Sequence, residues 1–138
     1  MENQKFHLSL FVSDTEETVR FYTRLFGDEP VKVKSDYAKF ELKDPALVIS
    51  FIQAPDKVKS EFGHLGFMVN SSEQVEARKA ALKSLEVKIG LEEQEVACCY
   101  AKQDKFWVND PDGYEWEVYH FIEDVEKNEE KYTAAPCC

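Results

Sequence analysis

The sequence of 138 residues predicts an α+β fold in which one chain contains two βαβββ modules that form a curved mixed sheet around a cup. Three observations lead to this prediction. Apolar and polar residues alternate at 6–12 and again at 64–69, as in half-buried strands. A helix start signal follows each of these strands. Sliding the sequence by 57 positions places His64 on His7 and the second helix start on the first.

The first module is expected over about residues 5–53. Its first strand has His7, Ser9 and Phe11 on one face and apolar residues on the other. Asp14 and the glutamate three positions later fit a capping box, and Gly27 ends the predicted helix. One or two strands are expected over 31–42, then a turn at 43–45 and a closing strand over 46–53.

The second module is expected over about residues 63–121. Ser71 and Gln74 form the second capping box, after the strand that begins at His64. A short strand is expected at 87–89, and 96–101 is either a strand or a loop edge. Strands at 106–109 and 114–121 form a hairpin across the turn Asp110-Pro111-Asp112-Gly113.

The two modules are expected to form a single domain over residues 1–122. Residues 123–138 are expected to form an acidic tail that ends in cysteines, and the segment 122–131 to be a solvated helix or a loose tail.

The net charge of −10 argues against nucleic acid and anionic membranes as partners, because both are bound mainly through Lys and Arg. No apolar run reaches the roughly 18 residues of a membrane span, and the first residues do not resemble a secretion signal. A cytoplasmic protein that acts on a small molecule, as a monomer or a homodimer, is therefore expected.

Two histidines and a carboxylate form a candidate metal site. The equivalent positions of His7 and His64 place both on the cup face of their strands. In the closing strand Glu115 and Glu117 have the same parity, and Glu117 is favoured because Glu115 lies next to the turn. His120 has the opposite parity and is interpreted as structural. Such a ligand set leaves coordination positions open for non-haem Fe(II), with tetrahedral Zn(II) or octahedral Mn(II) as alternatives.

All four cysteines occur as adjacent pairs, Cys98-Cys99 and Cys137-Cys138. Adjacent cysteines seldom bond to each other, and their soft sulfurs suit trivalent arsenic, Cd(II) or Hg(II). The first pair precedes the predicted metal-bearing hairpin and is interpreted as the second half of a site. The terminal pair is a scavenger, a transfer arm or without a role.

These residues resemble the vicinal oxygen chelate superfamily, and within it most closely the ArsI-type carbon-arsenic lyases and the cadmium-induced CadI proteins. The resemblance covers residues 5–121. Its most specific part is the block Cys-Cys-Tyr-Ala-Lys-Gln-Asp-Lys at 98–105, whereas the Asp-Pro-Asp-Gly turn is common to the superfamily. Ala97 departs from the threonine expected in relatives, but it affects none of the proposed ligands.

The resemblance implies an Fe(II)- and O2-dependent enzyme that converts trivalent organoarsenicals, such as methylarsenite or reduced aromatic arsenicals, to arsenite and an oxidised organic fragment. Fe(II) is the implied cofactor, with Zn, Mn or Ni as other occupants. His7, His64 and Glu117 would hold the iron, and Cys98 and Cys99 would hold arsenic. The remaining pocket wall would come from aromatic side chains, namely Tyr100, Tyr119, Phe11 and Phe51, although aromatic residues at such positions are more often core.

Two other functions stay open. A thiol-based cadmium or arsenic binding protein without catalysis would release no arsenite from methylarsenite in air. A glyoxalase-like isomerase or thiol transferase would use a divalent ion to polarise substrate oxygens. It would work without O2 and tolerate Cys98→Ser.

Overall fold

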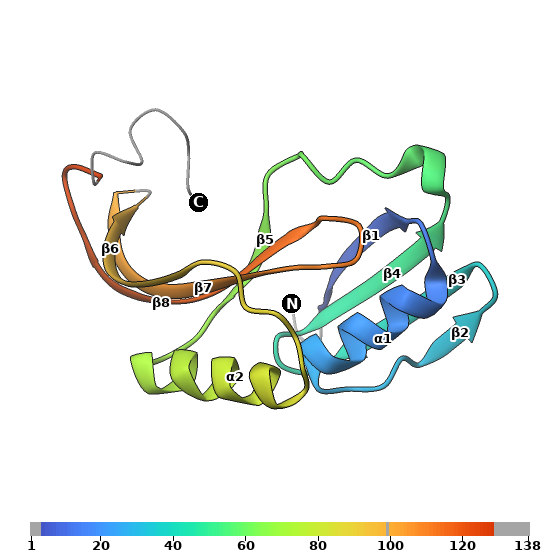
Figure 1. Ribbon diagram of the computed structural model, residues 1–138, viewed down its shortest axis with the longest axis horizontal. Helices are drawn as coiled ribbons and strands as arrows, with labels where there is room; N and C mark the ends of the chain where they lie inside the picture. The colour runs from blue at the N-terminus through green and yellow to red at the C-terminus, as the bar shows by residue number, and fades with distance from the viewer. Residues whose placement is uncertain (1–3, 99, 129–138) are drawn as a thin grey trace. The chain divides into compact units, whose positions relative to one another are not determined.

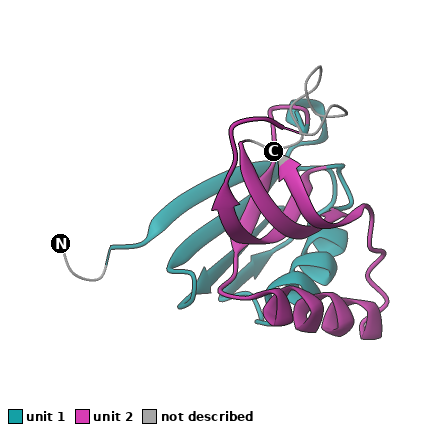
Figure 2. Ribbon diagram, turned by 90° about the vertical axis from the view of Figure 1, so that its left-hand side faces the viewer, with its two compact units in different colours: residues 1–60, 110–113 teal, residues 61–109, 114–138 magenta. Residues whose placement is uncertain are grey.

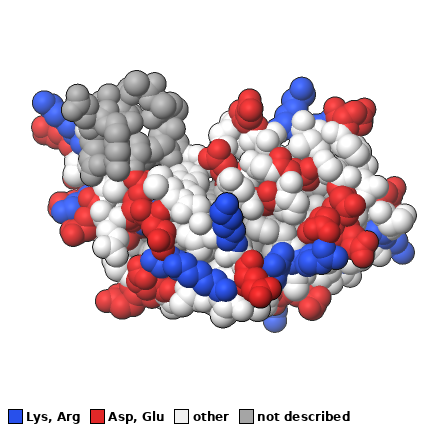
Figure 3. All heavy atoms as spheres, in the orientation of Figure 1, with Lys and Arg blue, Asp and Glu red and all other residues white. Residues whose placement is uncertain are grey.

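The computed structural model describes residues 4–98 and 100–128. The chain divides into two compact units, residues 1–60 with 110–113 and residues 61–109 with 114–138 (Figure 2). Acidic and basic side chains are interspersed on the face shown in Figure 3. Among the residues that the structure describes, no helix is long and apolar enough to span a bilayer.

The first unit is a four-stranded sheet with one long helix (Figure 1). The strand order is β1-β4-β3-β2, with β1 parallel to β4 and the other pairs antiparallel. Its elements are β1 (Phe6–Val12), α1 (Thr15–Phe26), β2 (Lys32–Lys34), β3 (Tyr37–Leu42), β4 (Leu47–Gln53) and the 3₁₀ turn η1 (Pro55–Lys57).

The second unit repeats this arrangement with the order β5-β8-β7-β6 and a parallel β5-β8 pair. Its elements are β5 (Leu65–Met68), α2 (Ser72–Ser84), β6 (Glu92–Cys98), β7 (Ala101–Asn109) and β8 (Glu115–Asp124). The same strand order in both units confirms the two predicted βαβββ modules. In the first unit Ser9 pairs with Ser50, and in the second Gly66 pairs with Glu117, so Ser50 is the counterpart of Glu117.

Helix α1 begins and ends where the sequence predicts. The Asp14 side chain accepts a hydrogen bond from the Glu17 N–H at 2.9 Å, and Gly27 ends the helix with a φ of 71°. A left-handed φ is one that glycine adopts without a steric penalty. The buried face of the helix places Tyr22 on Phe51 of β4, with ring centroids 4.3 Å apart. Phe51 is therefore a core residue and not part of a pocket wall.

Helix α2 has a similar cap but a weaker apolar face. The Ser71 hydroxyl accepts from the Gln74 N–H at 3.1 Å, and the Gln74 side chain accepts from the Asn70 N–H at 2.7 Å. Val75 and Leu82 are buried, whereas Leu85, which follows the last residue of the helix, is 47% exposed. The packing of this helix therefore depends on polar contacts as well.

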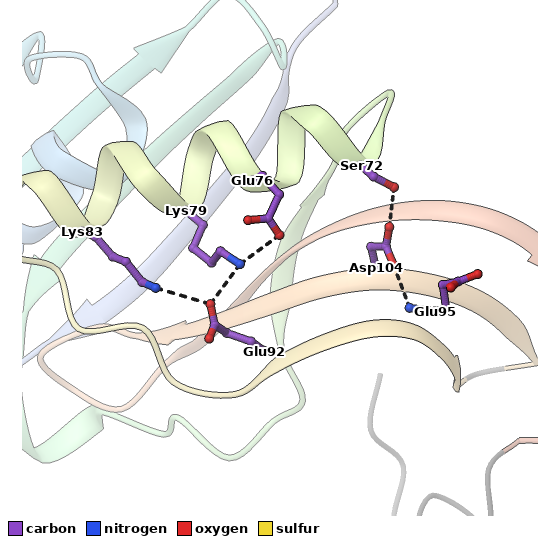
Figure 4. A network of polar contacts seen from close by, with 7 residues as sticks. All are labelled: Ser72, Glu76, Lys79, Lys83, Glu92, Glu95 and Asp104. Carbon is purple, nitrogen blue, oxygen red and sulfur yellow. Dashed lines mark hydrogen bonds and ion pairs between the residues drawn. The ribbon is translucent and has the colours of Figure 1, made fainter.

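Figure 4 shows two such contacts on the second unit. Lys79 of α2 lies 3.0 Å from Glu92 of β6, in an ion pair that Glu76 and Lys83 extend. Nearer the start of the helix, the Ser72 hydroxyl donates to Asp104 of β7, which also accepts from the Glu95 N–H at 2.7 Å. Asp104 thereby joins α2 and β7 to the irregular part of β6.

Three segments of the second unit differ from the prediction. Residues 87–89 form no strand, because after α2 the chain first meets β7 at Gly90, whose N–H donates to the Trp107 carbonyl at 2.7 Å. Residues 96–98 end β6 and Ala101 begins β7, so the segment predicted as a single strand or a loop edge contributes to two strands. Residues 122–124 continue β8, because β7 begins as early as Ala101 and offers backbone partners as far as Asp124.

Candidate active site

The second unit brings a histidine and a carboxylate together. His64 lies directly before β5, and Glu117 lies on the neighbouring strand β8. The His64 Nε2 atom is 3.4 Å from the Glu117 Oε1 atom. The Glu117 side chain is only 7% exposed, whereas His64 is 22% exposed. An imidazole with partial access to solvent therefore faces a nearly buried carboxylate.

Gly66 makes room for Glu117. The two residues are paired across β5 and β8, and a Cβ atom at Gly66 would lie 2.6 Å from the Glu117 Cγ atom and 2.6 Å from its carbonyl oxygen. Such contacts are far shorter than carbon atoms tolerate in packed proteins. A glycine at this position thus lets the Glu117 side chain lie over β5 and reach His64.

Lys105 compensates the charge of Glu117. Its side chain is completely buried, and its Nζ atom lies 3.2 Å from the Glu117 Oε2 atom. A buried carboxylate is costly unless a positive charge or hydrogen-bond donors accompany it. One carboxylate oxygen therefore faces the lysine and the other faces His64. We call His64, Lys105, Trp107 and Glu117 the Glu117 cluster.

Trp107 completes the cluster. Its ring lies 5.0 Å from the His64 ring in an edge arrangement, and the Lys105 ammonium is 5.6 Å from its centroid. Sequence reasoning assigned no role to Lys105 or Trp107. Strand parity could have indicated both residues. Lys105 and Trp107 are alternate residues of β7 and so share a face, and Trp107 is paired with Glu117 in the sheet.

Tyr119 has the same parity as Glu117, two residues further along β8. Burial raises the pKa of its phenol above the ordinary value of 10.0, and the charge of Glu117 raises that pKa further. The phenol therefore stays protonated at neutral pH and remains a hydrogen-bond donor.

The other candidate carboxylate and histidine of β8 lie in different surroundings. Glu115, at the start of the strand, is exposed, unlike Glu117. The His120 Nδ1 atom lies 3.2 Å from the Val69 carbonyl oxygen, a hydrogen bond to backbone at the end of β5. The choice of Glu117 as the metal ligand from this strand stays a prediction.

His64 and Glu117 are two of the three predicted metal ligands. Their imidazole nitrogen and carboxylate oxygens are donors that suit Fe(II), Zn(II) or Mn(II). The third predicted ligand, His7, lies on β1 of the first unit, where it is exposed and paired with Val48 of β4. Within each unit, the described residues form no group of three or more His, Cys, Asp or Glu side chains that could hold a metal ion.

The predicted thiol site lies at the turn between β6 and β7. Cys98 is the last residue of β6 and pairs with Ala101 of β7. Cys99 and the terminal pair Cys137-Cys138 lie outside the described residues. Tyr100 has a left-handed φ of 59° and is 62% exposed. Its role in substrate binding stays a prediction.

Comparisons with known proteins show the family and the fold of this chain. The family model of the glyoxalase/bleomycin resistance protein/dioxygenase superfamily matches residues 6–118. The chain is 42% identical over 132 residues to the trivalent organoarsenical cleaving enzyme of Bacillus sp. strain MD1. The aligned region covers 96% of this chain and 80% of the relative. It is 40% identical over 121 residues to the cadmium-induced protein CadI of Mycobacterium bovis, covering 86% of this chain and 77% of the relative.

Among solved structures, a glyoxalase/bleomycin resistance protein/dioxygenase from Alicyclobacillus acidocaldarius has the same fold. Its TM-score is 0.71 at 15% identity, over 89% of this chain and 96% of the other. The fold predicted from the internal repeat is therefore confirmed by an independent comparison.

Proposed function

Since the chain belongs to the glyoxalase/bleomycin resistance protein/dioxygenase superfamily, we propose that it cleaves the carbon-arsenic bond of trivalent organoarsenicals and so detoxifies arsenic. The observation that carries the proposal is the 42% identity, over almost the whole chain, to a relative named as a trivalent organoarsenical cleaving enzyme. The Glu117 cluster supports it, because a buried carboxylate beside an accessible imidazole is suited to hold part of a metal site.

His7, His64 and Glu117 are the proposed ligands of Fe(II). When bound, Fe(II) would supply the redox chemistry with O2 that no side chain of this protein can provide. Lys105 keeps the Glu117 carboxylate compensated and holds one of its oxygens, which leaves the other directed toward His64. Burial, and then the charge of Glu117, raise the pKa of the Tyr119 phenol, so the phenol stays protonated at neutral pH and remains a hydrogen-bond donor.

Cys98 and Cys99 are the proposed arsenic ligands. Two thiolates on one trivalent arsenic leave its third position for the organic group, so the thiols fix where that group points. Holding the reactants in one place turns an encounter between separate molecules into a local reaction.

The proposed reaction balances without a further reductant. Methylarsenite and one O2 give arsenite and formaldehyde, so the carbon-arsenic bond breaks while arsenic stays trivalent. The electrons that carbon loses are those that O2 gains, and the oxygen atoms of O2 end in the two products.

Arsenite release from methylarsenite, with added Fe(II) and in air or under argon, tests this function. We expect release in air only. His64→Ala should abolish turnover while the protein still binds the arsenical, and Cys98→Ser should abolish both. Arsenite release under argon, or in the Cys98→Ser protein, would contradict the proposed mechanism.

A second candidate is a thiol-based cadmium or arsenic binding protein. The 40% identity to a cadmium-induced protein favours it. In that case the Fe(II)-loaded protein would bind Cd(II) or arsenite stoichiometrically but release no arsenite from methylarsenite in air. The same assay therefore separates the two functions.

A further inference from the structure

His64 differs from its repeat counterpart His7 in its position along the strand. His7 lies inside β1, where it pairs with Val48 and has paired residues on both sides of it in the sequence. His64 precedes β5, and the pairing of that strand with β8 begins at Leu65. Neighbours in a sheet fix the direction of a side chain through its backbone. The direction of the His64 imidazole therefore depends more on the side chains that touch its ring.

Two side chains of the Glu117 cluster touch this ring. The Trp107 ring lies 5.0 Å from the His64 ring at an interplanar angle of 82°. Such an edge arrangement is favoured because the edge of one aromatic ring is positive and the face of the other is negative. The Glu117 Oε1 atom lies 3.4 Å from the His64 Nε2 atom. The carboxylate fixes where this nitrogen lies, and the indole limits how the imidazole turns about that point.

Trp107 is itself held on both edges of its strand. On one side it is paired with Glu117 of β8. On the other side its N–H donates to the Leu91 carbonyl at 2.9 Å, and its carbonyl accepts from the Gly90 N–H at 2.7 Å. The Lys105 ammonium lies 5.6 Å from the centroid of its ring. The half-buried indole is therefore a fixed surface against which the His64 ring packs.

We propose that Trp107 is a positioning residue, which holds the His64 imidazole in the direction required of a metal ligand. The inference rests on the proposed function, in which His64 and Glu117 bind Fe(II). Neighbours that orient a ligand ring raise metal affinity, because an oriented ring loses less conformational freedom when the ion binds. Trp107 needs no contact with the ion for this effect.

Mn(II) is a suitable probe, because its binding needs no O2 and because it prefers carboxylate oxygens to thiolates. The electron paramagnetic resonance signal of free Mn(II) gives the dissociation constant for the full chain. His64→Ala should abolish the binding, which assigns it to this site. In the metal-free protein, three-bond NMR couplings of the His64 side chain report whether it occupies one rotamer.

Trp107→Leu should weaken Mn(II) binding about three- to tenfold, the effect of losing one aromatic contact and the orientation of one ring. The His64 couplings should then become an average over rotamers. Trp107→Phe keeps an aromatic ring at the same backbone position and should retain most of the affinity and of the single rotamer. Trp107→Met replaces Trp107→Leu if circular dichroism shows that the latter is not folded.

Trp116 provides the matched control. It lies on the opposite face of β8 from Glu117, where its buried ring stacks on Phe67 with ring centroids 5.3 Å apart. Trp116→Phe should lower the stability of the protein, because it removes part of a buried ring. It should change neither the Mn(II) affinity nor the His64 rotamer.

An unchanged Mn(II) affinity or an unchanged His64 rotamer in Trp107→Leu would overturn the inference. Equal losses of affinity in Trp107→Leu and Trp116→Phe would overturn it as well, because general destabilisation would then be the cause. Failure of the proposed function looks different. Parent protein that binds Mn(II) through His64 but releases no arsenite with Fe(II) in air fails as a lyase, while the Trp107 variants still decide the role of this residue.

Discussion

At the scale of single residues, the buried Glu117 carboxylate depends on the identity of each of its neighbours. Glu117 has Lys105 at one oxygen, His64 at the other and Gly66 beneath its side chain. Removing one partner of a buried ion pair leaves the other charge without compensation, which costs more than the pair itself contributes. Lys105 is therefore the residue of this site on which stability depends most directly.

We expect Lys105→Met to lower the free energy of unfolding by about 3–5 kcal/mol, the cost of leaving a buried carboxylate uncompensated. Urea denaturation measures this loss. Lys102→Met on the same strand is the matched control, because its pair with Glu95 is largely exposed and should contribute less than about 1 kcal/mol. Similar small losses in both variants would contradict the interpretation of Lys105.

At the scale of elements, α2 depends on polar contacts that the apolar pattern does not reveal. The hydrogen bond from Lys79, and then its charge, lower the pKa of the Glu92 carboxyl below its ordinary value of 4.5. The hydrogen bonds that Lys79 donates to Glu76 and Glu92 likewise raise the pKa of Lys79. Because the folded-state pKa of Glu92 is lowered, the ion pair stabilises the fold above the ordinary carboxyl pKa and is lost as the pH falls through the lowered value.

Glu92→Gln tests this dependence. The variant should be slightly less stable than the natural sequence at pH 7, and the difference should vanish as the pH falls through the lowered pKa of Glu92. Because both partners are near the surface, 1 M NaCl should also reduce the difference. Thermal unfolding across this pH range measures it. A difference that persists at low pH would show that Glu92 acts through packing and not through its charge.

At the scale of the whole molecule, the units are not consecutive pieces of sequence. Residues 110–113, the Asp-Pro-Asp-Gly turn between β7 and β8, belong to the first unit. The buried Tyr22 hydroxyl donates to the Asp110 Oδ2 atom at 2.6 Å, and the Ser13 N–H donates to the Asp112 Oδ2 atom at 3.0 Å. The Asp-Pro-Asp-Gly turn thus has a structural role in this chain.

Tyr22→Phe removes one donor from the Asp110 carboxylate and keeps the ring that stacks on Phe51. We expect it to lower the free energy of unfolding by about 1–3 kcal/mol, the cost of taking a donor from a buried charged group. Tyr37→Phe, on a half-buried ring of β3, is the comparison variant and should change stability by less. Equal effects of the two substitutions in urea denaturation would contradict this role of Tyr22.

The sequence by itself determined the repeated modules, because strand alternation, capping residues and turn chemistry are local signals that each module displays twice. Local parity and a specific motif also predicted His64, Glu117 and the thiol pair as site residues, and the structure brings His64 and Glu117 together. Only the tertiary structure decided that Lys105 compensates Glu117, that Gly66 makes room for it and that the Trp107 ring contacts His64. Those contacts join residues on different strands and segments, and their pairing depends on register and chain path, which no local pattern encodes.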